Sequence, residues 1–248
     1  MRNAAQASAV LSTVSWALDE QYQQLICLYE KKLAAGLSDQ WPSTSGASED
    51  EKFSSVTVLF VDVLNYAALA EKFTDDELSE LVRRFYSSAG DTVHLFGARH
   101  MQFVGEALLA IFVVSTDTLS VNHGLRAARA ALGLVDATKR VAMYLQSTFA
   151  SRNLPAFGVC VALRSGPVAL TRLQDPLHGE TRILPIGDAA NATFLLQTQA
   201  VLVGWTVMAS VPMLRGITGA VKTGGRAMFN FPGRSLPVDA AELMGIAT

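Results

Sequence analysis

The sequence predicts an α/β fold, more specifically an α+β sandwich, and three observations support this prediction. An apolar run of strand length ends in a carboxylate, and a long amphipathic stretch with helical spacing follows it. Two short apolar runs then flank a Gly-Glu turn, as in a hairpin. A second helical stretch and a further strand complete the order strand, helix, hairpin, helix, strand. That order is the one of a ferredoxin-like βαββαβ core with later additions.

Residues 1–37 are predicted to form a helical segment outside this core. Apolar residues recur there at spacings of three, four and seven, and Gly36 stands where a helix would end. Residues 38–52 are rich in Ser, Asp, Glu, Gly and Pro, which cannot form a core, so they are predicted to be a linker. The globular domain then spans residues 53–248. The apolar positions of the helical segment are Val10, Val14, Leu18, Leu25 and Leu28.

The first strand and the first helix of the core have clear end signals. Ser55–Asp62 is predicted to be a buried strand that ends in a carboxylate. Thr74 and Glu77 match a capping box, in which each residue satisfies a free backbone N–H of the other at a helix start. The helix after them has one apolar stripe. Its members are Leu78, Leu81, Val82, Phe85 and Ala89.

A hairpin and a second helix follow. His100–Val104 and Ala107–Val114 are predicted to be two strands joined by a tight turn at Gly105-Glu106. Ala127–Leu145 has the apolar spacing of a helix. The hairpin and this second helix are the third to fifth elements of the predicted βαββαβ core.

The last predicted elements are two strands and a helix. Phe157–Leu163 is predicted to be a strand, which Ser165-Gly166-Pro167 then turns. A strand at Thr181–Ile186 leads into a helix that begins near Gly187-Asp188. No internal repeat interrupts this order.

Composition excludes several classes of protein. Half of the residues are hydrophobic and 17% are charged, the balance of a globular chain with a large core. The formal net charge of −2 provides no attraction to nucleic acid or to an anionic membrane. The longest apolar stretch, Ala200–Leu214, is shorter than the roughly 20 residues of a spanning helix, and no cleavage site follows the N-terminal apolar residues. We therefore expect a cytoplasmic protein without a membrane span.

The cysteines and histidines do not indicate a metal site. Cys27 and Cys160 lie far apart in the sequence and match no metal-ligand spacing. Two lone thiols in a chain of this size favour a reducing compartment. The four histidines likewise show no metal-ligand spacing and are interpreted as surface or core residues.

Five short stretches carry a resemblance to a known family. Three are Val56–Val63, Phe103–Phe112 and Leu184–Asn191, and two weaker ones are Leu163–Val168 and Phe231–Val238. In this order and at this spacing they resemble the catalytic domains of class III adenylyl and guanylyl cyclases. The resemblance covers roughly residues 55–242 and implies a cyclase-homology domain at residues 53–248.

The resemblance implies a metal site. In that family two carboxylates hold two divalent ions, Mg²⁺ or Mn²⁺, against a nucleoside triphosphate. Asp62 and Glu106 match the two carboxylates, and Val63 matches the residue that offers a backbone carbonyl. Glu106 stands where the family has Asp, and its longer side chain weakens a near-octahedral magnesium site. Since the family's site lies between two catalytic domains, the resemblance also implies a homodimer, or a heterodimer with another cyclase domain.

The same resemblance implies that groups which read the base and stabilise the transition state are lost. Gln102 stands where the family has a purine-reading Lys, and Leu184 stands where it has the Asp or Thr partner. Asn191 matches the Asn that positions the ribose. Leu195, four residues later, stands where an arginine should meet the α-phosphate charge. From the residues alone, Gln102 is equally a strand amide, Leu184 a core residue and Asn191 a helix-surface amide.

Two functions from different classes remain open. In the first, a degenerate cyclase-homology domain acts as a dimerising or regulatory module, with or without a bound nucleotide. In the second, the domain is an active metal-dependent purine nucleotide cyclase that makes cAMP or cGMP, with Glu106 as a metal ligand and an arginine from elsewhere. The residues at positions 102, 184 and 195 favour the first function, because each removes a group that the chemistry needs.

Overall fold

The computed structural model describes residues 51–115, 121–174 and 181–247. The predicted helical segment at 1–37 and most of the predicted linker at 38–52 lie outside the described residues. The first strand begins at Glu51, two residues before the predicted start of the domain. The domain therefore starts with regular structure at the end of the predicted linker.

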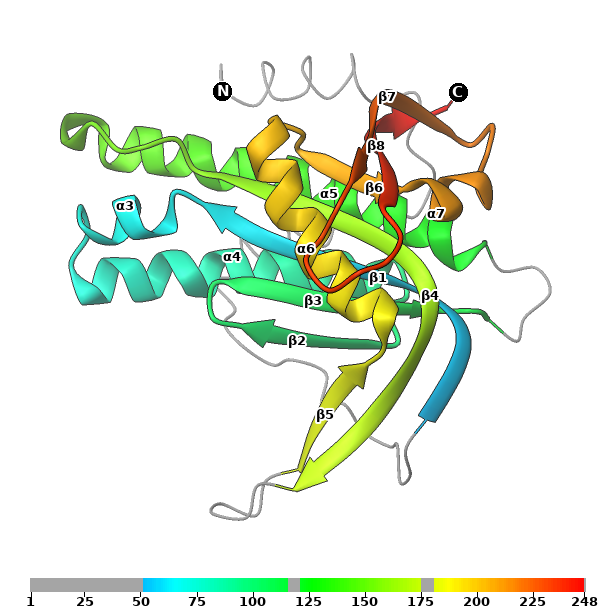
Figure 1. The fold of residues 1–248 in the computed structure, drawn as a ribbon. Helices are drawn as coiled ribbons and strands as arrows, with labels where there is room; N and C mark the ends of the chain where they lie inside the picture. The colour runs from blue at the N-terminus through cyan, green and yellow to red at the C-terminus, as the bar shows by residue number, and fades with distance from the viewer. Residues whose placement is uncertain (1–50, 116–120, 175–180, 248) are drawn as a thin grey trace.

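The described residues form one mixed sheet with helices on both faces (Figure 1). The strand order is β2-β3-β1-β4-β6-β8-β7, and β5 pairs with β4 beside this path. The predicted βαββαβ core is confirmed as β1, α4, β2, β3, α5 and β4. The bounds are β1 Glu51–Leu64, α3 Tyr66–Ala70, α4 Asp75–Leu95, β2 His100–Val104, β3 Ala107–Val113, α5 His123–Thr148, β4 Gly158–Gln174, β5 Thr181–Ile186, α6 Asp188–Val203, β6 Val207–Ser210, α7 Val211–Arg215, β7 Val221–Phe229 and β8 Val238–Ile246.

The core is divided between the two faces of the sheet. On one face, α4 and α5 pack against a large apolar cluster that includes Leu81, Phe85 and Leu134. On the other face, α6 packs against two smaller clusters, one around Phe60 and one around Leu196. Figure 1 shows α6 crossing the sheet on the face opposite to α4 and α5. The central strands β1 and β4 are therefore covered on both sides, which explains their nearly continuous apolar sequences.

The predicted turn at 165–167 is wrong, because β4 continues through it from Gly158 to Gln174. Opposite this point β1 carries a β-bulge, in which Ser54 and Ser55 face only Pro167. A bulge interrupts the ladder of hydrogen bonds, so a proline without an N–H is tolerated there. Pro167 thus marks an irregularity inside a long strand rather than its end.

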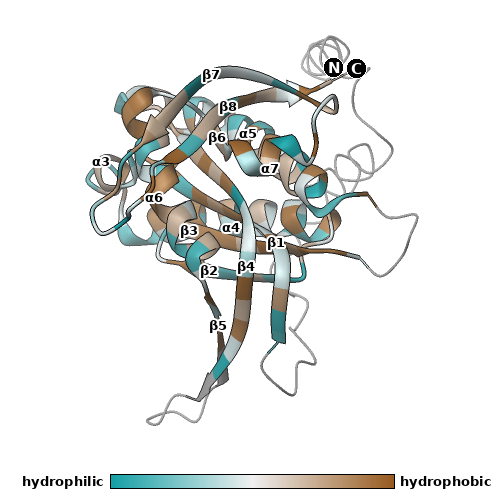
Figure 2. Ribbon diagram, turned by 45° about the vertical axis from the view of Figure 1, so that its right-hand side comes forward, coloured by the Kyte–Doolittle hydropathy of each residue, from teal (hydrophilic) through white to brown (hydrophobic). Residues whose placement is uncertain are grey.

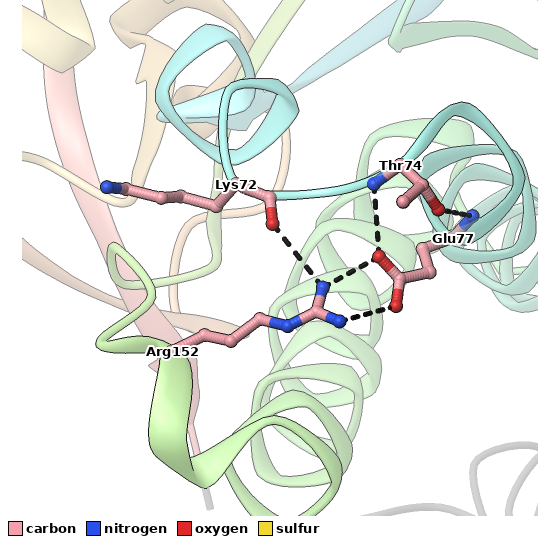
Figure 3. Close-up of polar contacts among 4 residues, drawn as sticks. All are labelled: Lys72, Thr74, Glu77 and Arg152. Carbon is pink, nitrogen blue, oxygen red and sulfur yellow. Dashed lines mark hydrogen bonds and ion pairs between the residues drawn. The ribbon is translucent and has the colours of Figure 1, made fainter.

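The predicted capping box at the start of α4 is confirmed, and a distant arginine joins it (Figure 3). The Glu77 backbone N–H donates to Thr74 Oγ1 at 3.3 Å, and the Thr74 N–H donates to Glu77 Oε2 at 3.0 Å. Arg152, which follows α5, donates to both oxygens of Glu77 at 2.7 and 2.8 Å. Hydrogen bonds from Arg152 lower the pKa of Glu77 to about 2. This two-point contact between Arg152 and Glu77 connects the start of α4 to the segment that precedes β4.

We expect an Arg152→Met variant to unfold at a lower urea concentration than the wild type at pH 7. The pKa of Glu77 is about 2 in the folded protein and about 4.3 in an unfolded chain. A depressed folded-state pKa contributes stability above the unfolded value, and that contribution is lost as the pH falls toward 2. The difference between variant and wild type should therefore shrink between pH 5 and pH 2. A control is Lys139→Met, which breaks the exposed Lys139–Asp136 pair. A difference for Arg152→Met that is constant over this range, or no larger than the control's, would contradict the prediction.

Candidate active site

Asp62 lies near the end of β1 and faces α6. Residues of β1 alternate between the two sides of the sheet, so that Val61 and Val63 face α4 and α5 while Phe60 faces α6. Asp62 therefore lies on the same face of the sheet as Phe60, and it is half-buried. Burial raises the pKa of Asp62, and the negative charge of Glu106 raises it further, while a hydrogen bond from the Val63 backbone lowers it. The structure thus brings the two predicted metal carboxylates into each other's electrostatic field.

Glu106 is presented by the hairpin between β2 and β3. Gly105 takes left-handed backbone angles (φ 58°), which the tight turn requires, and Glu106 follows it directly. Glu106 and Val63 both line a small hollow with Tyr66 and Tyr86. Burial raises the pKa of Tyr86, and Tyr66 and Glu106 add to this effect, so the phenol stays protonated at neutral pH. Two of the three predicted metal residues, Val63 and Glu106, therefore line one hollow with two phenols and an apolar floor, whereas Asp62 is not among its lining residues.

This arrangement fits a divalent cation. The like charges of Asp62 and Glu106 disfavour ionisation of Asp62, and a bound cation would relieve that repulsion. No cationic side chain in the described ranges forms an ion pair with either carboxylate. Carboxylate and carbonyl oxygens are the ligands that Mg²⁺ and Mn²⁺ prefer. When bound, such ions would activate a hydroxyl and neutralise phosphate charge.

The protein ligands are too few to complete a metal site alone. Within residues 51–115, 121–174 and 181–247 no group of three or more His, Cys, Asp or Glu side chains could hold a metal ion. Asp62, Glu106 and the Val63 carbonyl leave other coordination positions to phosphate oxygens and water. A site of this kind binds a metal together with a nucleotide more readily than the metal by itself.

The two predicted base-recognition positions lie near one buried histidine. Gln102 is half-buried on β2, and Leu184 is partly exposed on β5. Burial lowers the pKa of His100, while hydrogen bonds to the Gln102 side chain and to the Ile183 backbone raise it. His100 therefore lies close to Gln102 and to the neighbour of Leu184, and its buried Nε2 has no hydrogen-bond partner among the described residues. The sequence showed only that His100 lacked metal-ligand spacing, and no sequence signal indicated this contact.

The α6 helix carries the other two predicted positions. It begins after Gly187, where a Cβ would lie 2.6 Å from the Pro167 carbonyl oxygen, so this residue must be glycine. Asn191 is exposed, whereas Leu195 is half-buried and packs on the apolar cluster that includes Leu196. The position predicted to have lost its arginine is therefore part of an apolar contact within this chain.

Asn191 does not meet Asp62 within one chain. The α6 residue that contacts Asp62 is Gln197, whose Nε2 lies 3.5 Å from Asp62 Oδ2. Asn191 lies six residues earlier, which places it about 120° away around the helix. Asn191 and the residue that contacts Asp62 therefore lie on different faces of α6.

Comparisons with known proteins agree on one architecture. No protein-family model matches this chain. A membrane guanylyl cyclase of Dictyostelium discoideum is 26% identical over 90 residues, which are 36% of this chain and 6% of that protein. The chain thus spans only a small part of this curated relative's length.

Solved structures match over most of the domain. The guanylyl cyclase Cya2 superposes with a TM-score of 0.68 at 16% identity, over 80% of this chain and 95% of that one. The guanylate cyclase domain of RhGC from Catenaria anguillulae, solved with GTP, has a TM-score of 0.62 at 17% identity, over 79% and 99%. The dimeric guanylyl cyclase domain of RhoGC from Blastocladiella emersonii has a TM-score of 0.60 at 16% identity, over 79% and 99%. The chain has the fold of a class III nucleotide cyclase catalytic domain.

On this cyclase fold, Arg234 fixes the loop between β7 and β8 against the start of α6, where a second arginine, Arg164, binds the same carboxylate. Arg234 lies between β7 and β8 and forms a fork with both oxygens of Asp188, the first residue of α6. Arg164 of β4 donates to the same carboxylate at 3.0 Å. Hydrogen bonds from Arg234 lower the pKa of Asp188 more than burial raises it, and the charge of Arg164 lowers it further. Arg234 and Arg164 are therefore both paired with Asp188.

No helix in residues 51–115, 121–174 and 181–247 is both long enough and apolar enough to span a bilayer. The apolar stretch Ala200–Leu214 is divided among the end of α6, strand β6 and helix α7. Most of its apolar side chains, from Val207 to Leu214, lie in the core of the domain, whereas Val201, Leu202 and Val203 are exposed.

Proposed function

We propose that this chain is a degenerate member of the class III cyclases, a cytoplasmic module that dimerises and regulates rather than makes a cyclic nucleotide. The observation that carries the proposal is the position of Leu195. It packs against the apolar cluster around Leu196, Phe229 and Phe231. An aliphatic side chain in that contact provides no charge for a phosphate, and an arginine at this point can contribute about 10³–10⁵ in rate.

The base-recognition positions support the same proposal. Leu184 has no polar group in its side chain, and Gln102 lies close enough to His100 to raise the pKa of that imidazole. A site that reads a base through hydrogen bonds can gain about 10⁴–10⁵ in discrimination, and this one has lost the partner on β5. The module should therefore hold a nucleoside triphosphate through metal and phosphate contacts, with little choice between purines.

One observation favours the alternative, an active metal-dependent purine nucleotide cyclase. Burial raises the pKa of Asp62, and the negative charge of Glu106 raises it further, so Glu106 lies close enough to act on Asp62. A pair of carboxylates with no cationic partner among the described residues retains the charge that two-ion chemistry needs. The alternative also needs an arginine from another source, and Arg234 is already held by Asp188.

Nucleotide binding tests the proposal directly. In calorimetry with Mn²⁺ and nonhydrolysable analogues of ATP and GTP, we expect weak binding of both analogues to the wild type. Asp62→Asn should remove most of this binding, because it removes one of the two metal carboxylates. Tight binding of one purine with strong rejection of the other would favour the active cyclase.

We expect the domain to dimerise through the exposed side of α6. Most residues of this helix are apolar (Figure 2). Leu196 is buried, whereas the last turn exposes Val201, Leu202 and Val203, of which Leu202 is 73% exposed. A helix of this kind is normally covered on all sides. Sedimentation at tens of micromolar should therefore show a dimer. Leu202→Glu should shift the protein toward monomer, whereas Met143→Glu, on α5 across the sheet and 67% exposed, should not. A monomeric wild type, or equal effects of the two substitutions, would count against this interface.

A further inference from the structure

We propose that Gln197 is a positioning residue for the candidate metal site. Its side-chain amide donates to Oδ2 of Asp62, and this contact would orient the carboxylate for a divalent cation. The inference rests on the proposed function, in which Asp62 holds a metal. It adds the residue that sets the orientation of that carboxylate.

The burial of Gln197 makes this contact informative. Gln197 is only 6% exposed and lies on α6 between Leu196 and Ala200, both fully buried. A buried amide without a partner is costly, so a polar side chain at such a position is normally hydrogen-bonded. Among the described residues, the partner of the Gln197 amide is Asp62, at 3.5 Å. This distance is long for a hydrogen bond, and the amide is directed at the carboxylate.

The backbone of Gln197 is held at the same point. Cys160 of β4 is the cross-strand partner of Asp62. Its buried thiol donates to the Gln197 carbonyl oxygen at 3.8 Å and to the Trp205 carbonyl oxygen at 3.5 Å. Strands β1 and β4 and helix α6 therefore meet at Asp62. Because the helix is fixed by its buried face, the amide of Gln197 cannot move far from the carboxylate.

A neutral donor suits this position better than a cation. An arginine or lysine beside Asp62 would form an ion pair and compete with a divalent ion for the carboxylate. An amide restricts the rotation of the carboxylate and leaves its charge available. Groups that orient a metal ligand in this way typically account for about 10–100-fold in metal affinity. The contact also links Asp62 to α6, the helix that carries Asn191.

Electron paramagnetic resonance of Mn²⁺ tests the role without measuring activity. Free Mn²⁺ gives the signal, so titrations with a fixed amount of a nonhydrolysable ATP analogue, compared with the analogue alone, yield a dissociation constant for the wild type and for each variant. Gln197→Leu keeps the size of the side chain and removes the amide, and we expect it to bind Mn²⁺ at least about 10-fold more weakly. The matched control is Thr193→Val. Thr193 lies one turn earlier on α6, is fully buried, and donates only to the Ala189 carbonyl oxygen of its own helix. This control should bind Mn²⁺ as the wild type does.

Each outcome separates the inference from the proposed function. If Gln197→Leu binds Mn²⁺ like the wild type while Asp62→Asn does not bind it, the positioning role is overturned and the metal site stands. If the wild type and Asp62→Asn bind Mn²⁺ equally, the metal site of the proposed function fails. Nuclear magnetic resonance of the metal-free protein then decides the contact itself. The side-chain amide signals of Gln197, identified by their loss in Gln197→Leu, should shift in Asp62→Asn, and unchanged signals would overturn the contact.

Discussion

Purified protein supplied with Mg²⁺ and either ATP or GTP is expected to form no cyclic nucleotide above background. The absence of an arginine at Leu195 alone removes about 10³–10⁵ in rate from a phosphoryl-transfer site. Leu184 and Gln102 further weaken the orientation of the base, and independent losses multiply in rate because their free energies add. Together they place turnover below the detection limit of an ordinary assay.

The measurement is product formation by chromatography at high protein concentration, with an active cyclase as the positive control. Mn²⁺ should be tested beside Mg²⁺, because Mn²⁺ tolerates the altered geometry of Glu106 better than Mg²⁺ does. The Asp62→Ala variant reports any contaminating cyclase, since contaminant activity does not depend on this residue. Robust turnover that disappears in Asp62→Ala would establish the active alternative.

Four substitutions together are expected to create cyclase activity that no single one creates. Leu195→Arg supplies the charge for the phosphate, and Glu106→Asp restores the shorter metal carboxylate. Gln102→Lys and Leu184→Asp supply the pair that reads the purine. The fold already presents these positions on β2, β5 and α6, so the changes rebuild chemistry on an existing frame.

The largest structural cost should come from Leu195→Arg, which breaks an apolar contact on α6. We expect about 1–3 kcal/mol of lost stability, limited because Leu195 is half-exposed and a long side chain can reach water. Thermal unfolding of each variant separates misfolding from a failure of chemistry. Strong activity from Leu195→Arg alone would overturn this prediction, because it would mean that Glu106 and Gln102 already suffice for the chemistry.

Local signals in the sequence predicted much of the architecture. The capping box of Thr74 and Glu77 starts α4 as expected, and the turn at Gly105 joins β2 to β3. These elements were predictable because their signals act between residues a few positions apart. Pro167 was misread for the same reason, because the bulge that accommodates it is formed by Ser54 and Ser55, more than a hundred residues away.

The last three strands show the limit of local patterns. The sequence did not assign β6, β7 and β8, which extend the sheet beyond β4. The four residues of β6 are entirely buried and too short to show alternation, and most of β7 is exposed. Their pairing is set by partners across the sheet, which strand propensity does not record.

The sequence by itself determined which groups are present: the carboxylates Asp62 and Glu106, and Leu195 where a cyclase needs an arginine. Only the tertiary structure decided what these groups contact. It brought Glu106 into the field of Asp62, packed Leu195 against an apolar cluster and directed the buried amide of Gln197 at Asp62. The physical reason is that each contact joins segments far apart in the chain, and such contacts form only when α6 and the hairpin pack on the sheet. Residue type follows from the sequence, whereas distance and burial, which set charge and pKa, follow from that packing.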